Sequence, residues 1–305
     1  TAAAISVVFA LLLVSCDKRA LPTQPTGSET PTPGQQGQRS TGPIAFVSDR
    51  DGAEWIYLAN EDGSGVTPLV ATMTARHVIN IPAWAKDGRQ IAYSREGDIR
   101  VIGVNGSGDR VFASRGWHPA WSPDGRSLVF VGNSGGISTA PTSLELVNVD
   151  GSNRRTLFSD GGYASFPKWS PDGQKILYVA DGGYVDSCFG LWTVNADGSG
   201  ARQLGGPGVD RPSASCSFVE ASLSDGYWPA WSPDVTEIAF VSGPGPEAFS
   251  IHVIRADGSG RHLRVPAPAT YPDWTPDGRL IYTKGTWDGP SRIFISDGGT
   301  ERQLI

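Results

Sequence analysis

The stretch Trp169-Ser170-Pro171-Asp172-Gly173 decides the fold of this chain, because near copies of it recur along the sequence. The copies begin at Trp84, Trp121, Trp169, Trp231 and Trp274, and a proline stands two residues before each tryptophan, at Pro82, Pro119, Pro167, Pro229 and Pro272. The tryptophans are 37 to 62 residues apart. Strand-like repeats of about 40 to 45 residues are typical of propeller blades rather than of helical solenoids.

Each repeat predicts four short strands, as the copy at Trp169 illustrates. Residues 168–170 form an extended run, and 170–173 form a turn in which proline presets φ, aspartate bonds its own backbone and glycine accepts a positive φ. An apolar strand follows at 176–179, a third strand at 191–194 and a short polar strand at 202–204. A second turn of the Asp-Gly-Ser type separates the last two strands.

Six second strands are nearly identical and begin at Ile44, Ile91, Leu128, Ile176, Ile238 and Leu280. Continuous apolar strands fit sheets that are covered on both faces, as propeller blades are. The sequence therefore predicts an all-β fold over residues 43–305, a six-bladed β-propeller of four-stranded antiparallel blades. The first unit has no recognisable inner strand. It is expected to have three strands, to take a weak strand from before Pro43, or to need chain beyond Ile305.

The two recurring turns of each blade are expected on one face of the ring, because the four strands alternate in direction. The loops between second and third strands, and those between blades, then share the opposite face. All the variation in loop length falls there. Binding is expected on this variable face and at the mouth of the central channel.

The N-terminal segment is interpreted as a secretion signal followed by a lipid anchor and a linker. Ala2 to Ser15 is apolar and about the length of a signal-peptide core. Leu13-Val14-Ser15-Cys16 resembles the bacterial lipobox, so residues 1–15 are predicted to be a signal peptide, truncated because a basic start and an initiator Met are missing, and Cys16 the lipidated residue. The alternative is a buried apolar segment followed by a free thiol. Residues 16–42 are rich in Pro, Thr, Gln, Gly and Ser, which predicts a disordered linker. The expected location is extracytoplasmic, on a bacterial membrane facing the periplasm or at the cell surface.

Removing Cys16 leaves the even pair Cys188 and Cys216. Both fall in loops assigned to the variable face, so a disulfide between them is predicted for an oxidising compartment. The alternative is two unrelated thiols in exposed loops.

Charge and residue spacing argue against several classes of site. The net charge is −6 and no basic run exists, so no nucleic-acid partner is expected. The four histidines, His77, His118, His252 and His262, lack metal-ligand spacing, and Asp49-Arg50-Asp51-Gly52 with Glu54 fits a hairpin loop better than a calcium loop. No metal and no cofactor are predicted.

One sequence matches a catalytic motif. Gly132-Asn133-Ser134-Gly135-Gly136 fits Gly-x-Ser-x-Gly, but it follows a strand without leading into a helix. A chance match in a glycine-rich chain is the better interpretation, and no catalytic residue is assigned.

The residues just before the repeat prolines are expected to ring one channel mouth. They are Ile81, His118, Phe166, Trp228 and Tyr271, and they are preceded by Asn80, Trp117, Ser165, Tyr227 and Thr270. The candidate ligand-binding residues are therefore Trp117, His118, Phe166, Tyr227, Trp228 and Tyr271, whose rings could stack on a peptide or a sugar. The alternative is that these rings only fill the space between blades.

The repeat Pro-x-Trp-Ser-Pro-Asp-Gly with its Asp-Gly-Ser-Gly turn, and the stretch Ser48-Asp49-Arg50-Asp51-Gly52 followed by 55–60, resemble the TolB-type propeller over about 44–305. The resemblance implies six blades, an extracytoplasmic location, and binding of protein partners without catalysis. Similar repeats occur in prolyl-oligopeptidase-type peptidases and in oligogalacturonate lyase, whose histidine metal cluster has no counterpart in this sequence.

These observations lead to one expected function and one alternative. The expected function is a monomeric, non-catalytic envelope lipoprotein that binds a protein, peptide or envelope polymer at its variable face and channel mouth. The alternative is a polysaccharide lyase or hydrolase acting at the channel mouth. A spacer without a ligand is a third interpretation.

Overall fold

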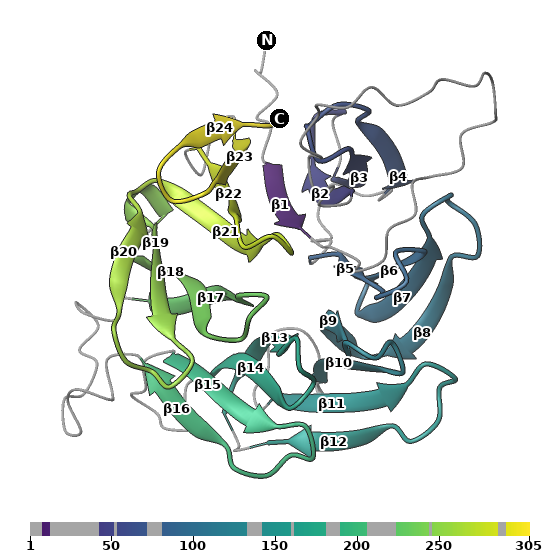
Figure 1. The fold of residues 1–305 in the computed structure, drawn as a ribbon. Helices are drawn as coiled ribbons and strands as arrows, with labels where there is room; N and C mark the ends of the chain where they lie inside the picture. The colour runs from purple at the N-terminus through teal and green to yellow at the C-terminus, as the bar shows by residue number, and fades with distance from the viewer. Residues whose placement is uncertain are drawn as a thin grey trace, which may run out of the picture.

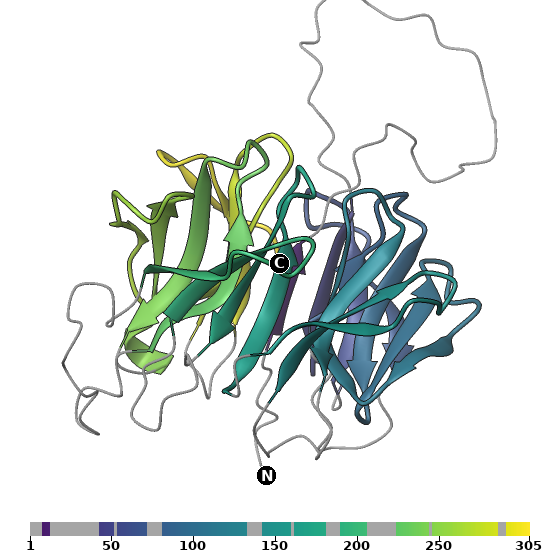
Figure 2. The same cartoon turned by 90° about the horizontal axis from the view of Figure 1, so that it is seen from below.

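The computed structural model describes residues 8–12, 43–51, 54–71, 81–132, 142–159, 162–180, 190–205, 224–243, 246–285 and 291–305. The strands form six antiparallel sheets of four strands each. The sheets stand around a central axis in the order of the sequence (Figure 1), and Figure 2 shows the ring from the side. The prediction of a six-bladed all-β propeller with four-stranded blades is confirmed.

Each blade runs from the axis outward in chain order. The blades are β1 (Val8–Leu12), β2 (Ile44–Ser48), β3 (Trp55–Ala59) and β4 (Thr67–Ala71); β5 (Ala83–Trp84), β6 (Gln90–Arg95), β7 (Asp98–Gly103) and β8 (Arg110–Ser114); β9 (Gly116–Trp121), β10 (Ser127–Gly132), β11 (Ser143–Asn148) and β12 (Arg155–Phe158); β13 (Ala164–Trp169), β14 (Lys175–Ala180), β15 (Gly190–Asn195) and β16 (Arg202–Gly205); β17 (Ser224–Trp231), β18 (Glu237–Gly243), β19 (Ser250–Arg255) and β20 (His262–Val265); and β21 (Ala269–Trp274), β22 (Leu280–Lys284), β23 (Arg292–Ser296) and β24 (Glu301–Gln303). A single 3-10 turn, Pro246–Ala248, is the one helical element in the described ranges, and none of their helices is long and apolar enough to cross a membrane.

The repeated turn between the first and second strands has the chemistry that the sequence predicts. The buried Ser170 hydroxyl donates to Asp172 at 2.6 Å and accepts the Lys175 N–H at 2.9 Å. Gly173 has φ +72° and donates its N–H to the Ser170 carbonyl at 2.9 Å. The hydrogen bond from Ser170 lowers the pKa of Asp172. At the equivalent of Gly173 the fifth blade has Val235, a β-branched residue held at φ +64°.

Side chains of the second strands fill the spaces between blades. The described residues form six buried clusters, and each one joins two neighbouring blades. Every second strand contributes a large ring that is at most 2% exposed: Phe46, Tyr93, Phe130, Tyr178, Phe240 and Tyr282. Because both faces of these strands are covered, the strands read as continuous apolar runs rather than as alternating patterns.

The first blade takes its innermost strand from far upstream. Residues 44–71 supply three strands, and β1 supplies the fourth by pairing antiparallel with β2, with Leu12 opposite Ile44 and Val8 opposite Ser48. Of the three expectations for this blade, the structure shows a strand from before Pro43.

The ring closes between the first and sixth blades by packing. Leu304 and Ile305 contact a cluster that includes Ile44 and Ile293. The Ile293 N–H donates to the Ile305 carbonyl at 3.0 Å. In the described ranges, no strand is shared between these two blades.

Candidate functional site

The residue before each repeat proline has a left-handed backbone. The φ values are +22° at Ile81, +52° at His118, +52° at Phe166, +49° at Trp228 and +51° at Tyr271. In the third to sixth blades this residue and its proline sit in a bulge, where the register between inner and second strands shifts. A bulge redirects a side chain, and each such backbone conformation costs about 1 to 3 kcal/mol, so the repeat maintains strain at one level of the channel.

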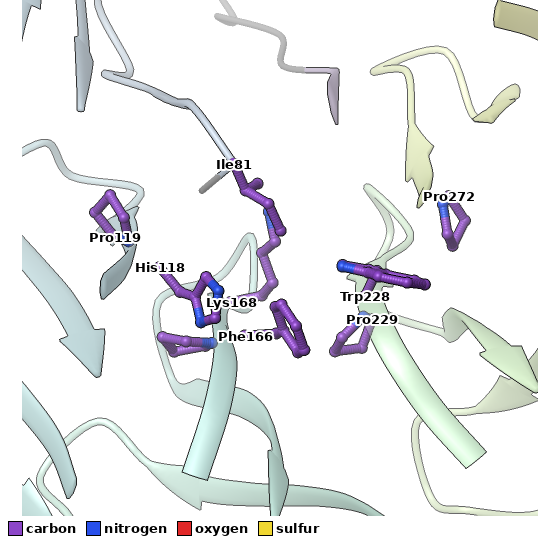
Figure 3. A pocket seen from close by; sticks show the side chains of 9 residues that line it. Ile81, His118, Pro119, Phe166, Lys168, Trp228, Pro229 and Pro272 are labelled. Atoms are coloured by element: carbon purple, nitrogen blue, oxygen red, sulfur yellow. The ribbon is translucent and has the colours of Figure 1, made fainter. Parts of the chain in front are cut away.

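Four of these side chains form a continuous row that we call the aromatic arc: His118, Phe166, Trp228 and Tyr271. Ring centroids are 4.3 Å apart between His118 and Phe166, 5.9 Å between Phe166 and Trp228, and 4.2 Å between Trp228 and Tyr271. Figure 3 shows the side chains of His118, Phe166 and Trp228 converging, with Ile81 of the second blade across from them. The predicted ring residues therefore do meet at the axis.

The other two candidate residues lie beside the arc or away from it. Tyr227 contacts Trp228 at 5.4 Å and Phe166 at 6.5 Å between centroids. Trp117 is 9% exposed, stays in register with Val131 of β10 and lies near Gly97 of the second blade. Its side chain is not part of the lining of the axial cavity.

The arc nearly fills the axis at its level. The cavity among its members has a volume of about 10 Å³. Its lining is Ile81, His118, Pro119, Phe166, Pro167, Lys168, Trp228, Pro229 and Pro272. Such a volume holds about one water molecule, so a ligand must lie over the arc or displace a ring. His118, Phe166 and Trp228 remain partly exposed.

Two charged residues on the innermost strands were missed by the sequence analysis. The residue between the repeat proline and tryptophan is alanine in three copies, Ala83, Ala120 and Ala230, but Lys168 and Asp273 occupy it in the fourth and sixth blades. Comparing the motif copies position by position would have found both. The side chain of Lys168 extends among the arc residues in Figure 3.

Burial destabilises the charged forms of Lys168 and Asp273. Burial lowers the pKa of Lys168, against the attraction of Asp273. Burial also raises the pKa of Asp273 to about 6, against the charge of Lys168. The Asp273 Oδ1 accepts the Trp274 N–H at 2.8 Å, whereas its Oδ2 and the Nδ1 of His118 are buried without a hydrogen-bond partner among the described residues. Desolvated ionisable groups on a channel are typical of functional sites.

The neutral form of His118 should make the fold sensitive to acid. Burial, with the charge of Lys168 as a smaller cause, lowers the pKa of His118 to about 3 from an ordinary value of 6.5. The unfolded chain therefore takes up this proton at higher pH than the folded chain does, and stability falls as pH decreases below 6.5. The variant His118→Phe keeps a ring in the arc. Between pH 7 and pH 4.5, we expect its free energy of unfolding to fall by about 2 kcal/mol less than that of the parent protein.

Urea denaturation at the two pH values measures this effect. His262→Phe is the matched control, because His262 is exposed on β20 of the fifth blade. Equal pH dependence of His118→Phe and the parent protein would contradict the argument.

The remaining features discussed from the sequence lie away from the arc or outside the described residues. Asp49 and Arg50 belong to the connection between β2 and β3, where Arg50 stacks on Phe46 and Tyr57 at 5.0 and 4.9 Å, as expected of a hairpin loop. Of the Gly-x-Ser-x-Gly match, only Gly132 is described. The described ranges contain no group of three His, Cys, Asp or Glu that could hold a metal. Cys16, His77, Cys188 and Cys216 lie outside the described residues.

The propeller fold is supported by comparison with solved structures. No protein-family model matches the sequence, and no curated protein matches it. Among solved structures, TolB from Acinetobacter baumannii is 20% identical with a TM-score of 0.68, over 86% of this chain and 63% of that one. This chain thus spans less than two thirds of that TolB.

Two further structures show how widely the fold is used. Oligogalacturonate lyase in complex with manganese is 14% identical with a TM-score of 0.55, over 86% of this chain and 73% of that one. The propeller domain of the trilobed protease from Pyrococcus furiosus, described as having an open velcro topology, is 14% identical with a TM-score of 0.53, over 86% of this chain and 94% of that one. At these identities the likeness establishes the propeller fold alone.

Proposed function

We propose that this chain is a non-catalytic protein of the bacterial cell envelope that binds a peptide segment of a partner protein over the aromatic arc. It would be anchored by lipid on Cys16 after cleavage of residues 1–15, act as a monomer, and carry a disulfide between Cys188 and Cys216 in the loops of the binding face. The likeness to TolB supports an envelope role.

The observation that carries the proposal is the strain repeated at the arc. Four blades hold a bulky ring at a left-handed φ next to a proline, and each ring touches the ring of the next blade at one level of the channel. Phe166 and Trp228 also pack against two of the clusters between blades, but the buried members of those two clusters include no residue of the arc. Strain that a repeat preserves at one level of a channel is better explained by binding than by stability.

The chemistry of the axis suits a peptide. The partly exposed faces of Phe166 and Trp228 offer stacking surface to an apolar or aromatic side chain. Lys168 offers a cationic donor, and the Nδ1 of His118, which has no hydrogen-bond partner among the described residues, offers a titratable ring nitrogen. A peptide backbone supplies both N–H and C=O groups to such partners.

The test is recovery of a partner from envelope extract by the immobilised protein. We expect one protein, identified by mass spectrometry, whose recovery falls at least tenfold with Trp228→Ala and with Tyr271→Ala. Leu263→Ala is the control. Leu263 is an apolar residue of the fifth blade, like Trp228, and it is 55% exposed on the outermost strand. Thermal unfolding checks that the variants keep their fold.

Two outcomes would decide against this function. Equal recovery by all variants would mean that the arc does not bind the partner. Depolymerisation of an envelope polysaccharide by the protein, abolished by Lys168→Met, would support the alternative of a lyase or hydrolase, a class to which one structural neighbour belongs.

A further inference from the structure

The innermost position of the first blade is a defined slot for a strand. We call it the inner slot: it lies between β2 on one side and β21 and β22 of the sixth blade on the other (Figure 1). β1 fills it with five residues in continuous antiparallel register with β2. Every residue of β2 is buried, so the slot lies in the interior and not at an exposed sheet edge.

The strand that fills the inner slot lies within the predicted signal peptide. Val8–Leu12 precedes Cys16, where the proposed function places cleavage and lipidation. Cleavage would remove β1 and leave one edge of β2 without a ladder partner. Buried N–H and C=O groups without partners are strongly unfavourable, so an empty slot would not persist.

The segment that remains is a poor replacement. Residues 16–42 contain Pro22, Pro25, Pro31 and Pro33 and no run of apolar residues like that of β1. Proline cannot donate to a ladder, and polar, proline-rich sequence has low strand propensity. The slot therefore favours a strand from another molecule.

A second observation points to the same slot. Asp273 pairs in register with Ile281, and Ile281 packs against Ile44 and Phe46 of the first blade. Cross-strand partners share a face of the sheet, so Asp273 lies on the face of the sixth blade that looks toward the first blade. Asp273 is 9% exposed and its Oδ2 has no partner in the described part of the chain. One wall of the slot thus carries a buried carboxylate oxygen, the Oδ2 of Asp273, to which no described residue donates a hydrogen bond.

We propose that, in the mature chain, the inner slot receives an extended apolar strand donated by a partner protein, paired antiparallel with β2 as β1 is and carrying one donor side chain toward Asp273. The proposal rests on the processing at Cys16 given above. Main-chain hydrogen bonds to β2 supply the affinity, and the side chains on alternate positions of the strand supply the specificity.

The test uses the chain from residue 16 onward with Cys16→Ser, and a fluorescent peptide copying residues 5–14 between solubilising lysines. Fluorescence anisotropy should show saturable binding with a Kd in the micromolar range, and the peptide should raise the Tm. The same peptide with proline in place of Ala10 should bind at least tenfold more weakly. The chain that retains residues 1–15 should also bind at least tenfold more weakly, because β1 already occupies the slot.

The role of Asp273 is tested with peptides that carry one lysine at each of the five strand positions. One position should gain at least fivefold in affinity, and that gain should vanish in Asp273→Ala. Binding of the proline peptide as tightly as the parent peptide, or no binding by the shortened chain, would overturn the proposal. Dimers of the shortened chain in sedimentation would also overturn it, because a second copy would then fill the slot.

Intact mass of the protein purified from bacterial membranes separates this proposal from the proposed function. A mass that includes residues 1–15 would refute processing at Cys16. The peptide measurement on the shortened chain would still decide whether the inner slot accepts a strand.

Discussion

Replacing Gly198 by alanine is expected to lower the free energy of unfolding by about 3 kcal/mol or more, a large effect for one methyl group. Gly198 lies in the Asp-Gly-Ser turn of the fourth blade at φ +94°, where a side chain is strained. A Cβ there would stand 2.4 Å from the carbonyl oxygen of Leu157 on the outer strand of the third blade. Neither backbone can move without separating the two blades.

Gly151→Ala is the matched control. Gly151 occupies the same turn of the third blade at φ +82°, but a Cβ on it would meet nothing within 4 Å. Its replacement should cost only the left-handed strain, about 1 to 2 kcal/mol. Thermal and urea denaturation of both variants measure the difference. Equal losses of stability in the two variants would show that the close contact between Gly198 and the Leu157 carbonyl does not add to the cost of the substitution.

The second large effect is expected at Lys168 and Asp273, two buried residues of the innermost strands whose charges act on each other. Lys168→Ala should destabilise the fold by about 3 kcal/mol at pH 8, because it leaves the buried Asp273 carboxylate uncompensated. Burial raises the pKa of Asp273 above its unfolded value of 3.8, so this group loses stability as pH rises through about 6. The loss in Lys168→Ala should therefore be smaller at pH 5 than at pH 8.

The double variant Lys168→Ala with Asp273→Ala should recover most of that stability. Alanine already stands at this position in three blades, as Ala83, Ala120 and Ala230, and an apolar replacement of a buried charge pair is often neutral or stabilising. The double variant should lie within about 1 kcal/mol of the parent protein, which implies a coupling of at least about 2 kcal/mol between the sites. Strictly additive losses in urea denaturation at pH 8 would contradict this coupling.

Much of the architecture could be predicted because its determinants are local. The Ser-Pro-Asp-Gly turn contains its own hydrogen bonds, such as those of Ser170 and Asp172, and it recurs at blade spacing. The apolar second strands needed only their composition to be recognised. Blade number, strand order and the convergence of His118, Phe166, Trp228 and Tyr271 all followed from these two repeats.

The other features of the fold and of the site could not be predicted, because they depend on three-dimensional contacts that a local sequence pattern does not encode. Trp117 and His118 are adjacent in sequence, yet the bulge at the proline sends only His118 to the axis. Lys168 and Asp273 lie two blades apart, and their relation appears only when the ring is closed. The innermost strand of the first blade lies about 30 residues before the strand with which it pairs, in a segment whose composition predicts export.

The packed closure has a consequence for how the molecule can move. Five of the six boundaries between blades join segments that follow one another along the chain, whereas the sixth joins Ile44 to Ile293, about 250 residues apart. Forming that last boundary requires the longest loop closure in the protein, so it should be completed after the others. In the described ranges every boundary between blades is packed rather than spanned by a sheet, and this one also joins the two ends of the propeller in the sequence, so the ring can open there and admit solvent to its centre while every ladder stays intact.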